Sequence, residues 1–163
     1  MSFDVFLVTF REGCKGSADP TAARAVLERT RYQHQPEFNA YDISFEDGSH
    51  VEMYADGLDG GEKPFDGAMF ALRGFSDGIG SFIFEFSRAA GCVIFPAMEP
   101  PCVLLPREDL AAHLPADLKQ DRERIPVASG AELLAALSGG YDSWRAYRDH
   151  VVRTSGGRPA GGT

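Results

Sequence analysis

The carboxylates between residues 42 and 66 are the densest group of side chains in this chain that could do chemistry. Within that segment only Lys63 and His50 oppose them. Several oxygen ligands that converge can hold a hard cation, but the run Asp-x-Asp-x-Asp-Gly of an EF-hand loop is missing. The simplest interpretation is a solvated strand face and an acidic loop; a docking surface for a basic protein and a metal site are the alternatives. The carboxylates are Asp42, Glu46, Asp47, Glu52, Asp56, Asp59, Glu62 and Asp66.

Cysteine and histidine give no spacing typical of a catalytic or metal site. The three cysteines form no CxxC pair, and Cys92 and Cys102 lie in apolar runs, where cysteine behaves as a small buried hydrophobe. Cys14 follows Gly13 beside Lys15, and a neighbouring lysine favours a thiolate, so it is the one candidate reactive thiol. The four histidines are scattered and no Gly-x-Ser-x-Gly motif occurs. We therefore predict no catalytic residue, no metal and no cofactor.

Two further segments could bind something. The glycines from Gly74 to Gly80 precede a helical pattern, but no Gly-Lys-Ser/Thr follows and Asp77 stands where an anion would bind, which favours a capped helix start over a phosphate loop. The segment 94–101 carries Phe95 and Met98 between prolines, which is typical of a sheet edge or the rim of a recognition site.

The acidic residues lie on a predicted β-hairpin. Tyr41, Ile43 and Phe45 alternate with polar residues over 41–46, and a second alternating run covers 51–55. Asp47-Gly48 between them is typical of a tight turn, because glycine accepts positive φ. We expect Asp42, Ser44 and Glu46 to share one face and Glu52 with Tyr54 to lie on another.

The remaining patterns place this hairpin in a mixed domain. We predict a strand over 3–10, a helix over 20–31 begun by Asp19-Pro20, and a helix begun by Ser76 or Asp77 and ended by Gly91. Short strands are expected over 68–72, 93–97 and 102–105, followed only by helices, one of them with a Ser129/Glu132 capping box. This order predicts an α+β, ferredoxin-like βαββ-helix-β antiparallel sheet with helices on one face and added C-terminal helices.

Length and composition indicate one domain. The chain has 163 residues, 44% of them apolar, and we assign a single domain to 1–154 (sheet-forming core 1–105, helical extension 106–154) and a flexible tail to 155–163. The net charge of −8 argues against nucleic acid and anionic membranes as partners. The N-terminus has no basic region of the kind that starts a signal peptide, so a cytoplasmic location is expected.

Four segments together carry a resemblance. Met1 to Leu7, the turn Arg11-Glu12-Gly13, Pro100 to Val103, and His113 to Asp117 are similar to segments of a group of small uncharacterised bacterial proteins, which begin with a Ser-Phe-Asp-Val-Phe-Leu strand. The resemblance extends to about Leu137 and includes the helix start at Ser129-Gly130. It implies a bacterial domain of unknown function and assigns no functional residue.

These observations favour a non-enzymatic protein-binding module, comparable to immunity proteins that cover a basic partner with carboxylates. The alternative is a small-molecule-binding protein or an enzyme with a pocket on an open sheet face lined by Asp42, Ser44, His50, Glu52 and Tyr54. Self-association through a C-terminal aromatic helix is a third hypothesis. The predicted binding residues are Asp42, Glu46, Asp47, Glu52, Tyr54, Asp56, Asp59 and Trp144.

Overall fold

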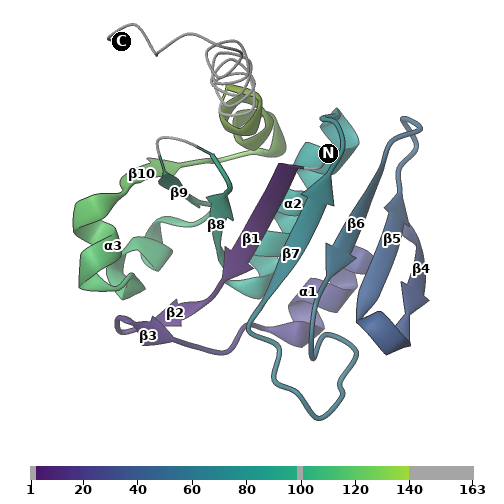
Figure 1. Cartoon of the computed structure of the whole chain (residues 1–163), viewed down its shortest axis with the longest axis horizontal. Helices are drawn as coiled ribbons and strands as arrows, with labels where there is room; N and C mark the ends of the chain where they lie inside the picture. Colours follow the sequence, from purple (N-terminus) through teal and green to yellow (C-terminus); the bar gives the residue numbers. More distant parts are fainter. Residues whose placement is uncertain (1–2, 99–100, 140–163) are drawn as a thin grey trace, which may run out of the picture.

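A computed structural model describes residues 3–98 and 101–139 of the chain. Its main feature is an eight-stranded sheet with the order β10-β9-β8-β1-β7-β6-β5-β4 (Figure 1). All neighbouring strands are antiparallel except the parallel pair β9 and β10. The strands are β1 Phe3–Val8, β4 Arg31–Gln35, β5 Ala40–Ser44, β6 His50–Tyr54, β7 Gly67–Leu72, β8 Val93–Pro96, β9 Cys102–Leu105 and β10 Glu123–Pro126.

Short elements and helices complete the fold. A small hairpin extends from the end of β1, and two helices lie behind the sheet in Figure 1. The described part of the chain ends in a helix over 130–139. The hairpin is β2 Phe10–Arg11 with β3 Cys14–Lys15; the α-helices are α1 Pro20–Leu27, α2 Asp77–Ala90 and α3 Ala116–Asp121; the 3-10 helices are η1 Pro36–Phe38 and η2 Glu108–His113.

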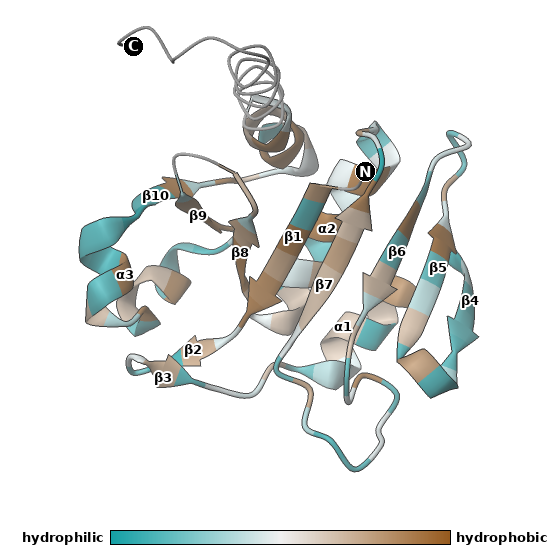
Figure 2. Ribbon diagram, viewed as in Figure 1, coloured by the Kyte–Doolittle hydropathy of each residue, from teal (hydrophilic) through white to brown (hydrophobic). Residues whose placement is uncertain are grey.

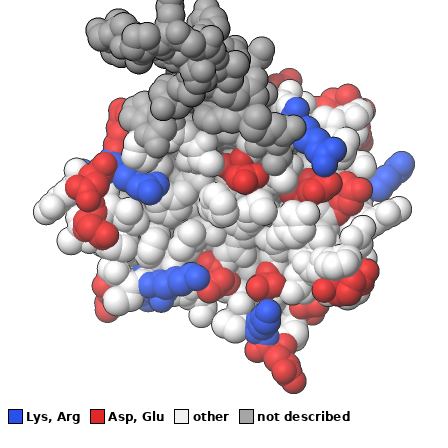
Figure 3. Space-filling model, in the orientation of Figure 1, with Lys and Arg blue, Asp and Glu red and all other residues white. Residues whose placement is uncertain are grey.

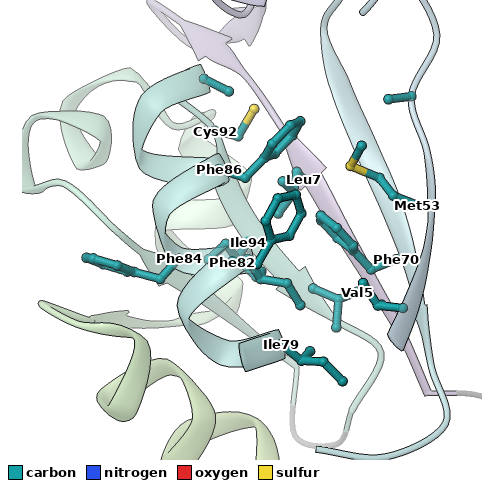
Figure 4. Packing of buried hydrophobic residues seen from close by; sticks show 14 of the residues in the cluster. Val5, Leu7, Met53, Phe70, Ile79, Phe82, Phe84, Phe86, Cys92 and Ile94 are labelled. Carbon is teal, nitrogen blue, oxygen red and sulfur yellow. The ribbon is translucent and has the colours of Figure 1, made fainter. Parts of the chain in front are cut away.

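The main core lies between the sheet and helices α1 and α2. Alternation along β1 directs Phe3, Val5 and Leu7 into it, and α2 contributes an apolar face at the predicted helical spacing. The ring of Phe70 on β7 meets both Phe82 and Phe86 edge-on at 6.1 Å (Figure 4). This packing fixes the sheet against α2, and the predicted α+β class with a largely antiparallel sheet is confirmed.

Capping residues set the ends of these helices as predicted. The Asp19 side chain accepts a hydrogen bond from Ala22 N, and Pro20 occupies the first turn of α1. Ser76 Oγ accepts one from Ile79 N at the start of α2, and Gly91 ends that helix with φ 78°. A left-handed residue at this position favours glycine because it carries no Cβ.

A second apolar cluster packs on the opposite face of the sheet, under η2. Along β8, Ile94 belongs to the main core while Val93 belongs to this second cluster, and Leu104 and Leu105 of β9 divide in the same way. Strands β8 and β9 are therefore buried on both faces, which explains their continuous apolar sequences in Figure 2. The cluster consists of Val93, Val103, Leu105, Leu110 and Leu114.

Two predicted boundaries are wrong because polar edge strands carry no apolar alternation. The helix expected over 20–31 ends at Leu27, where Thr30 Oγ1 donates to the Leu27 carbonyl at 2.6 Å, and Arg31 begins β4. The segment after residue 105, expected to be helical throughout, contains β10. The sheet is correspondingly larger than the predicted order allows. The predicted tail over 155–163 lies outside the described residues.

The hairpin between β5 and β6 forms where predicted but with a longer loop. Phe45 N donates to Ser49 O at 2.9 Å and Gly48 N donates to Phe45 O at 3.0 Å, so the loop is Glu46-Asp47-Gly48 with Gly48 at φ 84°. A two-residue turn at Asp47-Gly48 would pair Asp42 with Met53. The extra residue pairs Asp42 with Glu52 instead. The prediction that these two carboxylates lie on different faces is therefore wrong.

Candidate functional site: the open sheet face

Within residues 3–98 and 101–139, the face of the sheet opposite α1 and α2 is covered at one end only. Among the described elements, η2 and α3 lie at the β8–β10 end of this face, whereas strands β1, β7, β6, β5 and β4 present it to the viewer in Figure 1. Alternate residues of these strands, such as Asp42, Ser44 and Tyr54, are exposed. We call the surface of these five strands the open face.

Strand register arranges the side chains of the open face in rows across the strands. Phe6 pairs with Phe95 on one side and with Met69 on the other, and Met69 pairs in turn with Tyr54. Phe6 is 43% exposed and Tyr54 37%, although both are large apolar or amphipathic side chains. We call Phe95, Phe6, Met69 and Tyr54 the apolar row.

An acidic row runs beside the apolar row, two residues along each strand. Asp4 pairs with Ala71, Ala71 with Glu52, and Glu52 with Asp42. Side chains directly opposite across antiparallel strands lie about 5 Å apart, so Asp42 and Glu52 form a like-charge pair that costs stability. We call Asp4, Glu52 and Asp42 the acidic row; Figure 3 shows acidic side chains within a largely neutral centre on this side of the molecule.

Glu52 is the best-connected member of the acidic row. The Tyr54 hydroxyl donates to its Oε2 at 3.2 Å, and Arg73 approaches its Oε1 at 3.9 Å. The negative charge of Glu52 raises the pKa of Tyr54, because it disfavours a phenolate beside it. The long contact to the exposed Arg73 leaves this carboxylate within reach of another cation.

The face becomes basic beyond the acidic row. Ser44 pairs with His50 on β6 and with Arg31 on β4. Arg73 follows the end of β7 and lies on the same side, since it reaches Glu52. The open face is thus striped in the order apolar, acidic, basic, and a partner that fits it must carry more than a uniform positive charge.

A groove continues the apolar row toward α3. It has a volume of about 680 Å³ and is lined by Phe6, Val8, Phe95, Met98, Leu118 and Arg122, among others. The Arg122 guanidinium lies 5.2 Å from the centre of the Phe95 ring, a cation–π contact that holds the α3 side of the groove. From the predicted recognition segment 94–101, residues 95–98 and Pro101 line this groove.

Asp47 and Glu46, predicted to bind a partner, lie in the hairpin loop rather than on the open face. Asp47 Oδ2 accepts from Gly78 N at 3.0 Å and Oδ1 accepts from Ser49 N at 2.9 Å, with a further bond from the Ser49 hydroxyl. These hydrogen bonds lower the pKa of Asp47 to about 2. Its carboxylate therefore ties the hairpin to the start of α2, while Glu46 is exposed beside Phe45.

Asp56 and Asp59 lie at the other end of β6, in the loop between β6 and β7. Asn39 Nδ2 donates to Asp56 at 2.6 Å, Lys63 lies 3.8 Å from the same carboxylate, and Gly61 N donates to Asp59 at 3.0 Å. No group of three or more His, Cys, Asp or Glu side chains in the described residues could hold a metal ion. Trp144 lies outside the described residues.

The two cysteines predicted to lie in the core do so, whereas Cys14, expected in a loop, lies in the short strand β3. Cys92 and Cys102 are buried and Cys14 is exposed. Burial raises the pKa of the Cys92 thiol to about 11, and its sulfur lies 3.2 Å from Thr9 Oγ1. Burial likewise raises the pKa of Cys102. Both side chains are therefore buried, protonated thiols at neutral pH.

Of the predicted binding residues, the structure thus brings Asp42, Glu52 and Tyr54 together on the open face. Phe6 and Met69 of the apolar row were missed, since the members of the row come from four strands and meet only through strand order.

No family model, curated protein or solved structure shows a significant match to this chain. The resemblance to small bacterial proteins stays a prediction. Among the described residues, no helix is both long enough and apolar enough to cross a bilayer. Any functional assignment therefore depends on the geometry of the open face.

Proposed function

We propose that this protein is a non-enzymatic recognition module whose open face binds a basic, partly apolar segment of another protein. The observation that carries the proposal is the juxtaposition of the apolar and acidic rows. Tyr54 exposes apolar surface beside Glu52, which faces Asp42, and Phe6 exposes more in the same apolar row. A partner that supplies cations to this pair and covers the rings would relieve both unfavourable features.

The wider charge balance supports the same class of partner. A net charge of −8 repels nucleic acid and anionic lipid but speeds encounter with a basic protein. The carboxylates at the two ends of the hairpin, such as Glu46 and Asp59, add to that long-range attraction although they do not share the open face. This division of roles is comparable to that of an immunity protein, with contact on one face and steering from the whole surface.

The sheet order supports a ferredoxin-like centre for this scaffold. Strands β8, β1, β7 and β6 are consecutive and antiparallel, with α1 after β1 and α2 between β7 and β8. We infer that this unit is extended by β4 and β5 at one edge and by β9 and β10 at the other. The extension at β4 and β5 widens the open face by two strands.

The groove beside α3 favours one alternative, binding of a small apolar molecule. Its lining is largely apolar, with Phe6, Phe95 and Leu118 among its residues, and Arg122 is available for an anionic group. Binding of a small molecule there would depend on Phe95 and Leu118 and would be insensitive to Asp42. That difference separates the two functions.

The test is quantitative binding to a purified basic partner. Affinity capture from the host at low salt, followed by purification of the captured protein, supplies the partner. The double variant Asp42→Asn, Glu52→Gln is expected to bind about tenfold or more weakly, with a smaller salt dependence. Glu37→Gln, an exposed carboxylate on η1, is the matched control. An unchanged affinity of the double variant would overturn the proposal.

A further inference from the structure

We infer that the segment bound by the open face is an amphipathic helix lying across the strands, with an apolar stripe on the apolar row and Lys or Arg along one flank. This inference depends on the proposed function and adds the form and orientation of the ligand. Three properties of the face carry it: the hydrogen bonding of its strands, the spacing of its rows and the distance between them.

The strands under the apolar row have no free backbone edge. β1 is paired with β8 and β7, and β7 with β1 and β6. An extended peptide on this face would find no backbone partners for its own N–H and C=O groups, which are costly to leave unpaired when buried. A helix satisfies these groups internally and can bind through side chains alone.

The row spacing matches a helix better than a strand. Neighbouring strands are about 4.8 Å apart, so the apolar row from Phe95 to Tyr54 is about 14 Å long. Side chains on one face of a helix recur every three or four residues, about 5 Å along its axis, whereas those on one side of a strand recur about every 6.7 Å. A helix of about ten residues therefore keeps in step with all four members of the row.

The distance between the rows sets the position of the charges. The acidic row lies two residues along the strands, about 6.7 Å from the apolar row. A helix about 10 Å across spans both rows when it rests on the line between them. Its basic residues must then flank the apolar stripe on the side of Asp42 and Glu52.

The groove can hold one end of the bound helix, whichever way the helix runs. Phe6 and Phe95 belong both to the apolar row and to the groove, where Met98 and Leu118 add further apolar surface. A large apolar side chain at the end of the stripe would fill this space. The opposite end of the row is Tyr54, which is 37% exposed and pairs with Ala40 of β5.

The experiment uses the full chain and two synthetic peptides of identical composition. Both contain about fifteen residues of Leu and Lys in one ratio; one has Leu at helical spacing and the other has Leu and Lys in strict alternation. Fluorescence anisotropy measures their affinities for the native protein and for Phe6→Ala, Asp42→Asn and Phe38→Ala. Phe38 is the matched control, because it is 66% exposed on η1 and belongs to none of the five strands of the open face.

The expected result is at least tenfold tighter binding of the helical peptide, weakened about tenfold by Phe6→Ala, weakened less by Asp42→Asn and unchanged by Phe38→Ala. Circular dichroism of each variant checks its fold. Equal or tighter binding of the alternating peptide, still sensitive to Asp42→Asn, would overturn the helix while leaving the proposed function intact. Absence of binding by both peptides, or binding insensitive to both variants on the open face, would overturn the two together.

Discussion

The two ends of one sheet face differ in what covers them. At the β8–β9 end, Val93, Val103 and Leu105 are buried under η2, and every outward position is aliphatic or aromatic. At the β1–β5 end, Phe6, Tyr54 and Asp42 are all exposed. Where an element of the same chain covers the sheet, the outward side chains are uniformly apolar. The open face instead carries apolar and charged rows side by side, a mixture that neither a purely solvated face nor a permanently covered one would need.

The largest expected effect on stability comes from comparing a core residue of β7 with an open-face residue of the neighbouring strand β1. Phe70→Ala removes a ring that is 0% exposed and meets Phe82 and Phe86, and it should lower the free energy of unfolding by about 3–5 kcal/mol. Phe6→Ala on the open face should cost about 1 kcal/mol or less. Urea unfolding measures both. Similar costs would mean that the open face is buried in the native protein.

A core substitution at the covered end of the sheet should destabilise mainly its own surroundings. Leu114→Ala leaves a cavity under η2, where Leu114 is 2% exposed, and is expected to cost about 2–3 kcal/mol. Since this cluster is separate from the main core, amides of η2 and β9 should lose more protection from hydrogen exchange than those of α2. A uniform loss of protection across both regions would show that the two clusters unfold as one unit.

Features that depend on local sequence were predictable, whereas features that depend on strand pairing were not. α2 was predictable at both ends, because Ser76, Gly91 and a one-sided apolar pattern all act locally. The edge strand β4 was not, because Arg31 to Gln35 are polar and pair only through β5. The rows of the open face required strand order and the exact length of the hairpin loop, and one extra loop residue moved Glu52 to the face of Asp42.

The hairpin loop offers a test through pH. The pKa of Asp47, lowered to about 2 from an ordinary value near 3.8, means that its ionised form stabilises the folded chain above about pH 4. That contribution is lost as the pH falls through about 4 toward 2. Asp47→Asn should therefore lower the melting temperature at pH 7 and flatten its decline below pH 4. Glu37→Gln is the control, and an identical acid profile for Asp47→Asn and the native protein would contradict the assigned hydrogen bonds.

The smallest expected effect on stability is a gain rather than a loss. Asp42→Asn removes one of two carboxylates that face each other across β5 and β6, so it should stabilise the free protein by a few tenths of a kcal/mol, about the size of one cross-strand charge pair. Unfolding in low salt measures the gain, and added salt should reduce it. The same substitution should weaken binding of a basic helix.

A residue that costs stability in the free protein but adds affinity in the complex is what a recognition surface requires. Stabilisation without loss of binding would place the partner elsewhere. Loss of binding together with a loss of stability would make Asp42 a structural residue of the hairpin, and the comparison between the covered and open ends would then rest on the apolar row alone.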